Sequence, residues 1–150
     1  MDNSLNEYQD KLDIEARVKN LPAVTDFIGK SISCLKISQM ELAQVLIVAE
    51  ELFVNIASYA YKTGIGRACL LTRVSRQENS IEITFIDSGV KYNPLEREDP
   101  DITLEATKRK QGGLGVFFVK KKVDKMTYSY EDGKNILTVK KFFKGNADGD

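Results

Sequence analysis

A glutamate and an asparagine lie four positions apart in one predicted helix. Glu51 and Asn55 fall in the stretch ELFVNIASYAY, and side chains at this spacing project from the same side of a helix. A solvated helix face would explain the pair. However, Ile47, Val48 and Val54 flank it, and a carboxylate and an amide among apolar neighbours need partners. The amide oxygen of Asn55 suits a hard cation such as Mg²⁺, and Glu51 can take a proton from an attacking hydroxyl.

An aspartate ends a predicted strand and begins the stretch DSGVKYNP. A carboxylate placed like Asp87 can point into a cleft at the sheet edge and accept a hydrogen bond from an exocyclic amine such as that of adenine. Gly89 would let a ring approach the backbone closely. An Asp-Ser-Gly turn, in which Asp87 binds local amides, explains the same residues. Both interpretations stand, because Tyr92-Asn93-Pro94 prolongs the feature past a simple turn.

Three glycines stand at the start of another predicted helix, in the stretch QGGLGVFF. Backbone N–H groups at a helix start bind phosphate, and Gly112, Gly113 and Gly115 would allow close approach. The basic run at 108–110, which ends in Lys110, can neutralise phosphate charge. A flexible linker before a helix explains the same pattern. The spacings GxxxxGK[ST] and GxGxxG are both absent, which excludes the familiar phosphate loops.

A small set of helices and strands must position these stretches. Apolar periodicity predicts strands at 11–19, 67–76, 81–87, 125–132 and 135–143, and helices at 20–35, 38–61 and 112–123. Ser38 or Gln39 begins the long helix, and Asp132-Gly133 turns the last two strands into a hairpin. The polar segment 88–112 is long enough to favour a functional loop. This order predicts an α+β fold, a two-layer α/β sandwich with helices on one face of a mostly antiparallel sheet.

Length and composition are typical of one globular domain. We expect it to cover residues 11–144 of the 150, between flexible tails at 1–10 and 145–150. The 22 basic and 22 acidic residues balance, which argues against direct nucleic-acid or membrane binding. The chain has no histidine, which excludes Ser-His-Asp and Cys-His chemistry and histidine-bound metals. With no signal peptide and no span-length apolar stretch, we expect a cytoplasmic protein.

The order and spacing of the three stretches resemble the boxes of the Bergerat-fold ATPases, the superfamily of DNA gyrase, histidine kinases and mismatch-repair ATPases. Within it the chain looks most like the bacterial anti-sigma factor serine/threonine kinases. Their helix carries E-x-x-x-N, their strand ends in D-x-G-x-x-[FY]-x-P, and their G-G-x-G box opens a helix. The resemblance runs from about residue 12 to residue 143. The chain departs from the family pattern at Tyr59, where a histidine is usual, and at Lys91 and Gln111.

The resemblance implies a role for each matching residue. Glu51 looks like the general base, Asn55 like the Mg²⁺ ligand and Asp87 like the acceptor for the adenine amine, with Gly89 beside the ring. Residues 90–111 resemble an ATP lid. The positions implied to bind ATP are Asn55, Asp87, Gly89, Tyr92, Lys110, Gly112, Gly113, Leu114, Gly115 and Asn135, the last in place of a polar residue near the adenine.

The function that the resemblance implies is that of an ATP-binding anti-sigma regulator. Such a protein phosphorylates a serine or threonine on an anti-sigma factor antagonist, holds either the antagonist or a sigma factor, and forms a homodimer. Three other interpretations stand beside it: a nucleotide-gated binding module without phosphotransfer, a detached catalytic domain of a histidine kinase, and an α/β domain without a ligand. The histidine-kinase interpretation requires a partner that supplies the histidine, because this chain has none.

Overall fold

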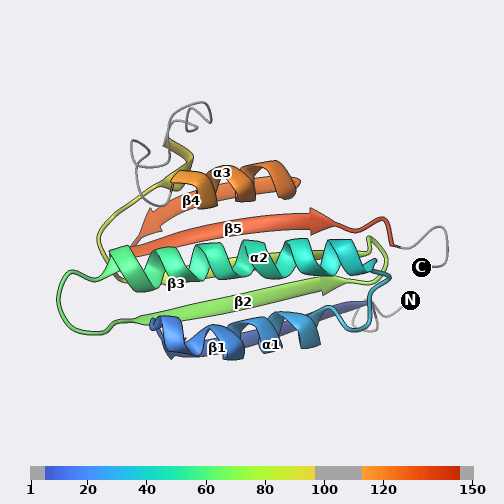
Figure 1. Ribbon diagram of the computed structural model, residues 1–150, viewed down its shortest axis with the longest axis horizontal. Helices are drawn as coiled ribbons and strands as arrows, with labels where there is room; N and C mark the ends of the chain where they lie inside the picture. The colour runs from blue at the N-terminus through green and yellow to red at the C-terminus, as the bar shows by residue number, and fades with distance from the viewer. Residues whose placement is uncertain (1–5, 97–112, 146–150) are drawn as a thin grey trace.

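A single five-stranded antiparallel sheet forms one layer of the molecule (Figure 1). The computed structural model describes residues 6–96 and 113–145. The strand order is β1-β2-β3-β5-β4. The strands are β1 (Glu7–Glu15), β2 (Arg67–Ser75), β3 (Ser80–Asp87), β4 (Lys125–Glu131) and β5 (Lys134–Phe142). The register pairs Asp87 at the end of β3 with Asn135 at the start of β5.

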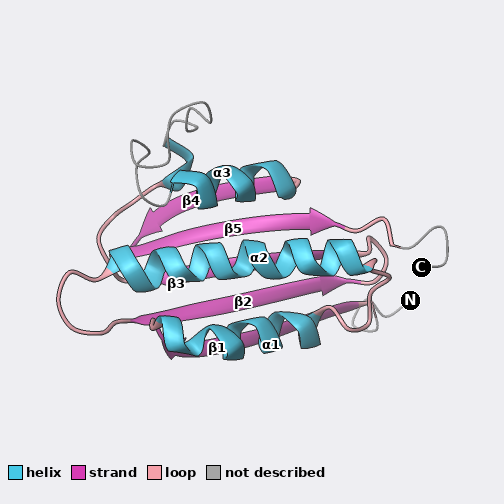
Figure 2. Ribbon diagram, in the orientation of Figure 1, coloured by secondary structure: helices cyan, strands magenta, loops and turns pink. Residues whose placement is uncertain are grey.

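Helices form the second layer, on one face of the sheet (Figures 1 and 2). They are α1 (Leu21–Ser31), α2 (Gln39–Asn55) and α3 (Gly113–Lys122), and α2 contacts both of the others. The side chains of β2 and β3 alternate between this core and the uncovered face, so Leu70 and Phe85 are fully buried in the same core as Phe53 of α2. The predicted two-layer arrangement is therefore confirmed.

The first strand begins earlier than the sequence predicts. Residues 7–10, expected in a flexible tail, belong to β1 and pair with the C-terminal half of β2, from Glu7 opposite Ser75 to Asp10 opposite Thr72. These four side chains are exposed, so no apolar alternation marks the segment. β1 ends at Glu15, and Val18, expected to continue it, lies in the 3₁₀ turn η2 (Val18–Asn20). Residues 1–5 and 146–150 lie outside the described residues.

The long helix starts as predicted and ends differently. Ser38 caps it through a capping box: the Ser38 hydroxyl accepts the N–H of Glu41, and the Glu41 carboxylate accepts the N–H of Ser38. After Asn55 the predicted α-helix is replaced by a π-helical turn, η3 (Ile56–Ala60). Ala60 ends the helical segment, so its carbonyl has no partner within the helix. That carbonyl accepts the N–H of Val90 at 2.7 Å.

The segment after β5 is hydrogen-bonded to the start of α2. The Glu41 carboxylate also accepts the N–H groups of Lys144 and Gly145, at 2.8 and 3.0 Å. Burial raises the pKa of Glu41, but these hydrogen bonds and that from Ser38 together lower it by more, so the pKa lies below its ordinary value. The Asn79 side chain binds the backbone of Lys36 and of Phe143. The last described residues therefore support the first turn of α2.

Candidate functional site

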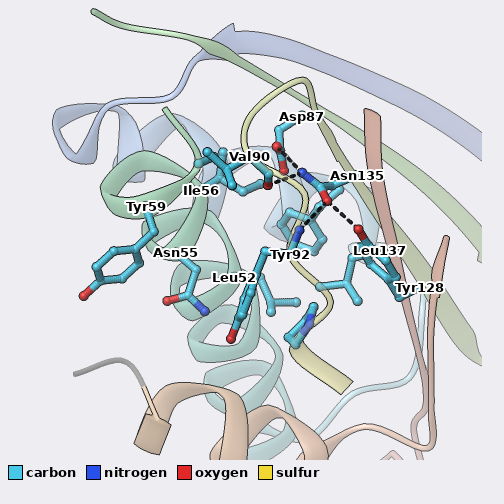
Figure 3. A pocket seen from close by; sticks show the side chains of 13 residues that line it. Leu52, Asn55, Ile56, Tyr59, Asp87, Val90, Tyr92, Tyr128, Asn135 and Leu137 are labelled. Atoms are coloured by element: carbon cyan, nitrogen blue, oxygen red, sulfur yellow. Dashed lines mark hydrogen bonds between the residues drawn. The ribbon is translucent and has the colours of Figure 1, made fainter. Parts of the chain in front are cut away.

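A pocket opens where α2 and η3 meet the ends of the central strands (Figure 3). The empty space in and above it is about 520 Å³, which includes space open to solvent. Its walls are mainly apolar, with one carboxylate and two amides among them. The lining residues are Leu52, Asn55, Ile56, Tyr59, Ala60, Phe85, Asp87, Val90, Tyr92, Pro94, Tyr128, Asn135 and Leu137. An apolar cavity with a few polar groups is typical of sites that bind a small organic molecule.

Asp87 places a buried carboxylate in the pocket wall. Its Oδ1 accepts the N–H of Gly89 and the Nδ2–H of Asn135, both at 2.9 Å. Among the described residues, none donates a hydrogen bond to Oδ2. The local Asx turn and the pocket-lining carboxylate, which the sequence leaves as alternatives, thus occur together. Oδ2 can accept a hydrogen bond from a donor inside the pocket.

The loop after Asp87 is packed tightly against η3. The N–H of Val90 donates to Ala60, and the N–H of Ser88 donates to the Tyr61 hydroxyl at 3.0 Å. A β-carbon built on Gly89 would lie 2.2 Å from the Ala60 carbonyl oxygen. The glycine is therefore required by the approach of two backbone segments. Contact between Gly89 and a bound ring stays a prediction.

Asn135 joins this loop to the sheet. Its Nδ2 donates to Asp87 and to the Val90 carbonyl, both at 2.9 Å, and its Oδ1 accepts the N–H of Tyr92 at 3.0 Å and the hydroxyl of Tyr128 at 2.5 Å (Figure 3). Burial is the main cause that raises the pKa of Tyr128, so its hydroxyl stays protonated and donates at neutral pH. Asn135 and Tyr92 thus lie in the pocket wall, and their contact with a nucleotide stays a prediction.

Glu51 and Asn55 point to different parts of the site. Asn55 lines the pocket, whereas Glu51, one turn earlier in α2, lies against the start of α3. A β-carbon built on Gly115 would lie 2.3 Å from the Glu51 Oε2 atom. The glycine at 115 therefore makes room for the carboxylate of Glu51. This contact joins the first and third sequence motifs, while Asn55 and Asp87 join the first and second.

Some predicted positions are described only in part or not at all. Gly113 and Leu114 form the first turn of α3, and nothing is described of the Leu114 side chain. Lys110, Gly112 and Gln111 lie outside the described residues, as does most of the predicted lid.

The other departures from the family pattern lie near the pocket. Tyr59 is 48% exposed and lines the pocket. The Lys91 ammonium lies 5.2 Å from the centroid of the Tyr130 ring, a cation–π distance.

Sequence reasoning missed three residues that build the site. Ala60 and Tyr61 hold the 88–92 loop, and Tyr128 holds Asn135. Tyr61 also donates its hydroxyl to the Arg67 carbonyl, and a β-carbon on Gly66 would collide with its ring at 2.1 Å. The pairing of a bulky Tyr61 with a nearby glycine is a signal in the sequence, whereas the contacts of Ala60 depend on the backbone alone.

The donor set suits a nucleotide better than a metal bound by protein alone. Within residues 6–96 and 113–145, no three acidic or cysteine side chains gather into a metal site. A cation beside Asn55 can complete its coordination with oxygen atoms of a ligand, as Mg²⁺ does with phosphates. None of the helices in this part of the chain combines the length and the apolar character of a membrane span.

Comparisons with known proteins agree with this geometry. The family model of the histidine kinase-like ATPase domain matches residues 14–141. Serine/threonine-protein kinase BtrW of Bordetella bronchiseptica is 32% identical over 92 residues, which are 61% of this chain and 63% of BtrW. The crystal structure of the RsbU and RsbW domains of Rv1364c from Mycobacterium tuberculosis is similar with a TM-score of 0.62 and 11% identity. That match covers 90% of this chain and 32% of the mycobacterial one.

These matches span less than two thirds of either relative. The structural likeness concerns the fold, and it confirms the predicted Bergerat-type architecture of helices on an antiparallel sheet. A fold of this kind implies nucleotide binding, which agrees with the apolar pocket and its buried carboxylate. The sequence match, the strand order and the pocket at the end of α2 lead to one conclusion: the chain belongs to the family of histidine kinase-like ATPase domains.

Proposed function

We propose that this protein binds ATP in the pocket and phosphorylates a serine or threonine on an anti-sigma factor antagonist. The observation that carries the proposal is the Asp87 carboxylate, with Oδ1 held by two N–H donors and Oδ2 available in an apolar pocket. An adenine ring fits such walls, and its exocyclic amine can donate to Oδ2. The similarity to a serine/threonine-protein kinase and membership in the ATPase family support the reaction class.

The proposal assigns the remaining roles to neighbouring side chains. Asn55 can ligate Mg²⁺ through its amide oxygen, and a bound Mg²⁺ would neutralise charge on the phosphates. Glu51 would orient the attacking hydroxyl and take its proton. The hydroxyl oxygen forms a bond to the γ-phosphorus of ATP, the bond to the β–γ bridging oxygen breaks, and ADP leaves. The N-terminal end of α3, with Lys110 and Gly112 before it, is proposed to receive the phosphates.

The biological role proposed is partner switching by a cytoplasmic homodimer that holds either the antagonist or a sigma factor. A nucleotide-gated binding module would use the same pocket without phosphotransfer. The Glu51 carboxylate beside the start of α3 favours the kinase, because a module that transfers no phosphate has no need of a base there. A detached histidine-kinase domain would have to act on a histidine of another protein.

Calorimetry of ATP binding with and without Mg²⁺ tests the first step. Binding that strengthens with Mg²⁺ is expected, and no binding at millimolar ATP would overturn the proposal. Phosphotransfer to a candidate antagonist then tests the second step, with Glu51→Ala compared against Glu50→Ala as a neighbouring control. We expect Glu51→Ala to keep ATP binding and lose transfer. Full transfer by Glu51→Ala would exclude Glu51 as the base.

A further inference from the structure

Asn135 has no hydrogen-bonding capacity left for a ligand. A side-chain amide offers two N–H donors and two acceptor lone pairs. All four are used within the protein, by Asp87, Val90, Tyr92 and Tyr128. The partners also fix which way the amide points, because the Tyr92 N–H can only donate and the Val90 carbonyl can only accept. A direct hydrogen bond to a nucleotide would cost one of these bonds in a residue that is 6% exposed.

The same bonds determine how Asp87 presents its carboxylate. Asn135 lies directly across the β3–β5 ladder from Asp87, and both side chains are buried on the helix-facing side. The Asn135 donor and the Gly89 N–H converge on Oδ1, which holds the carboxylate against rotation. Oδ2 is thereby left as the acceptor in the pocket. Preorganisation of this kind favours the ligand that matches the fixed group over one that does not.

We propose that Asn135 is a positioning residue that sets base selectivity through Asp87 without forming a hydrogen bond to the nucleotide. This inference rests on the proposed ATP site. By holding Oδ2 toward the pocket, Asn135 makes the site select a base that carries an exocyclic amine and reject one that carries a carbonyl at that position. Asn135 also binds the backbone of Val90 and Tyr92, and these hydrogen bonds keep the 88–92 loop against the sheet, next to the proposed position of the base.

The test compares ATP with inosine triphosphate, which has a carbonyl in place of the amine. For the wild type we expect ATP to bind roughly 10- to 150-fold more tightly, the value of one hydrogen bond to a charged acceptor. In Asn135→Ala we expect this ratio to fall roughly 3- to 10-fold, the cost of ordering one side chain on binding. Thr138→Val is the matched control, because it removes the Thr84–Thr138 hydrogen bond between the same strands on the uncovered face.

If Asn135 had a purely structural role, Asn135→Ala would weaken the binding of both nucleotides equally and leave the ratio of their affinities unchanged. That result would overturn the inference. A ligand donor that took the place of the Tyr92 N–H on Asn135 Oδ1 would appear in amide hydrogen exchange, because the Tyr92 N–H would lose its bond to Asn135 and exchange faster when ATP binds. Under our inference the Tyr92 N–H is equally or better protected with ATP bound. If Asn135→Ala does not fold, Tyr128→Phe removes one of the four bonds, and we expect a smaller fall in the same ratio.

The wild type separates the two levels of the proposal. If it binds both nucleotides with equal affinity, ATP binding stands and the inference about Asn135 fails. If it binds neither nucleotide, the proposed function fails and the inference fails with it.

Discussion

Replacing Asp87 by asparagine should invert the base preference of the pocket. The change keeps Oδ1 and therefore the hydrogen bonds from Gly89 and Asn135, so we expect the free energy of unfolding to change by less than about 1 kcal/mol. It replaces Oδ2 by an NH₂ group, which turns the acceptor in the pocket into a donor. The lost charge-assisted hydrogen bond is worth about 1.5–3 kcal/mol, or roughly a 10- to 150-fold rise in the Kd for ATP.

The assay is calorimetric titration of wild type and Asp87→Asn with ATP and with inosine triphosphate. Inosine triphosphate should bind the variant more tightly than ATP does, because its carbonyl can accept from the new NH₂ group. Asp13→Asn is the control for net charge, since Asp13 pairs with Arg67 on the uncovered face of the sheet, at the edge strand. An unchanged affinity for ATP in Asp87→Asn would refute the assignment of this carboxylate to the base.

Three further changes test the surroundings of the site. Gly115→Ala should displace the Glu51 carboxylate with little loss in the free energy of unfolding, because the end of that side chain can move. Single-turnover assays should then show slower phosphotransfer at an unchanged affinity for ATP. An unchanged rate of phosphotransfer would contradict this prediction. Gly89→Ala should lower the free energy of unfolding, measured in urea, by about 1–3 kcal/mol, because the new β-carbon meets the backbone of Ala60. A stability equal to that of the wild type would mean that the loop adapts freely. Glu41→Gln should lose about 1 kcal/mol at neutral pH. The folded-state pKa of Glu41 is lowered, so its contribution is present above the ordinary value of 4.5 and is lost as the pH falls through the lowered pKa. The difference in the free energy of unfolding between wild type and Glu41→Gln should therefore disappear in acid. A difference that stays constant with pH would argue against this role of Glu41.

The helices and strands could be predicted where one face of an element is apolar. β2, β3 and α2 follow such patterns, and the Ser38 cap has a recognisable signature in the sequence. The start of β1 could not be predicted, because residues 7–10 are exposed and are held by backbone pairing with β2. The π-helical turn after Asn55 was also missed, since apolar periodicity does not distinguish it from the last turn of an α-helix.

The sequence indicated which polar residues would gather at the candidate site, but it did not indicate which residues they would contact. Asn55, Asp87, Tyr92 and Asn135, which are far apart in the sequence, line one pocket. For Gly89 and Gly115, the contacts that require a glycine in the structure are not the ones that the sequence suggested. Gly89 was expected to admit a ring and Gly115 a phosphate, but the described contacts are with Ala60 and Glu51. Such close approaches depend on the three-dimensional packing of distant segments, which spacing alone does not contain.

The ties between Glu41, Asn79 and the last described residues lie at the end of the sandwich away from the pocket (Figure 1). This arrangement gives the molecule a natural point of attachment. A tether or fluorophore joined beyond Gly145 would leave the mouth of the pocket unobstructed. Immobilised protein should therefore bind its ligand as the free protein does.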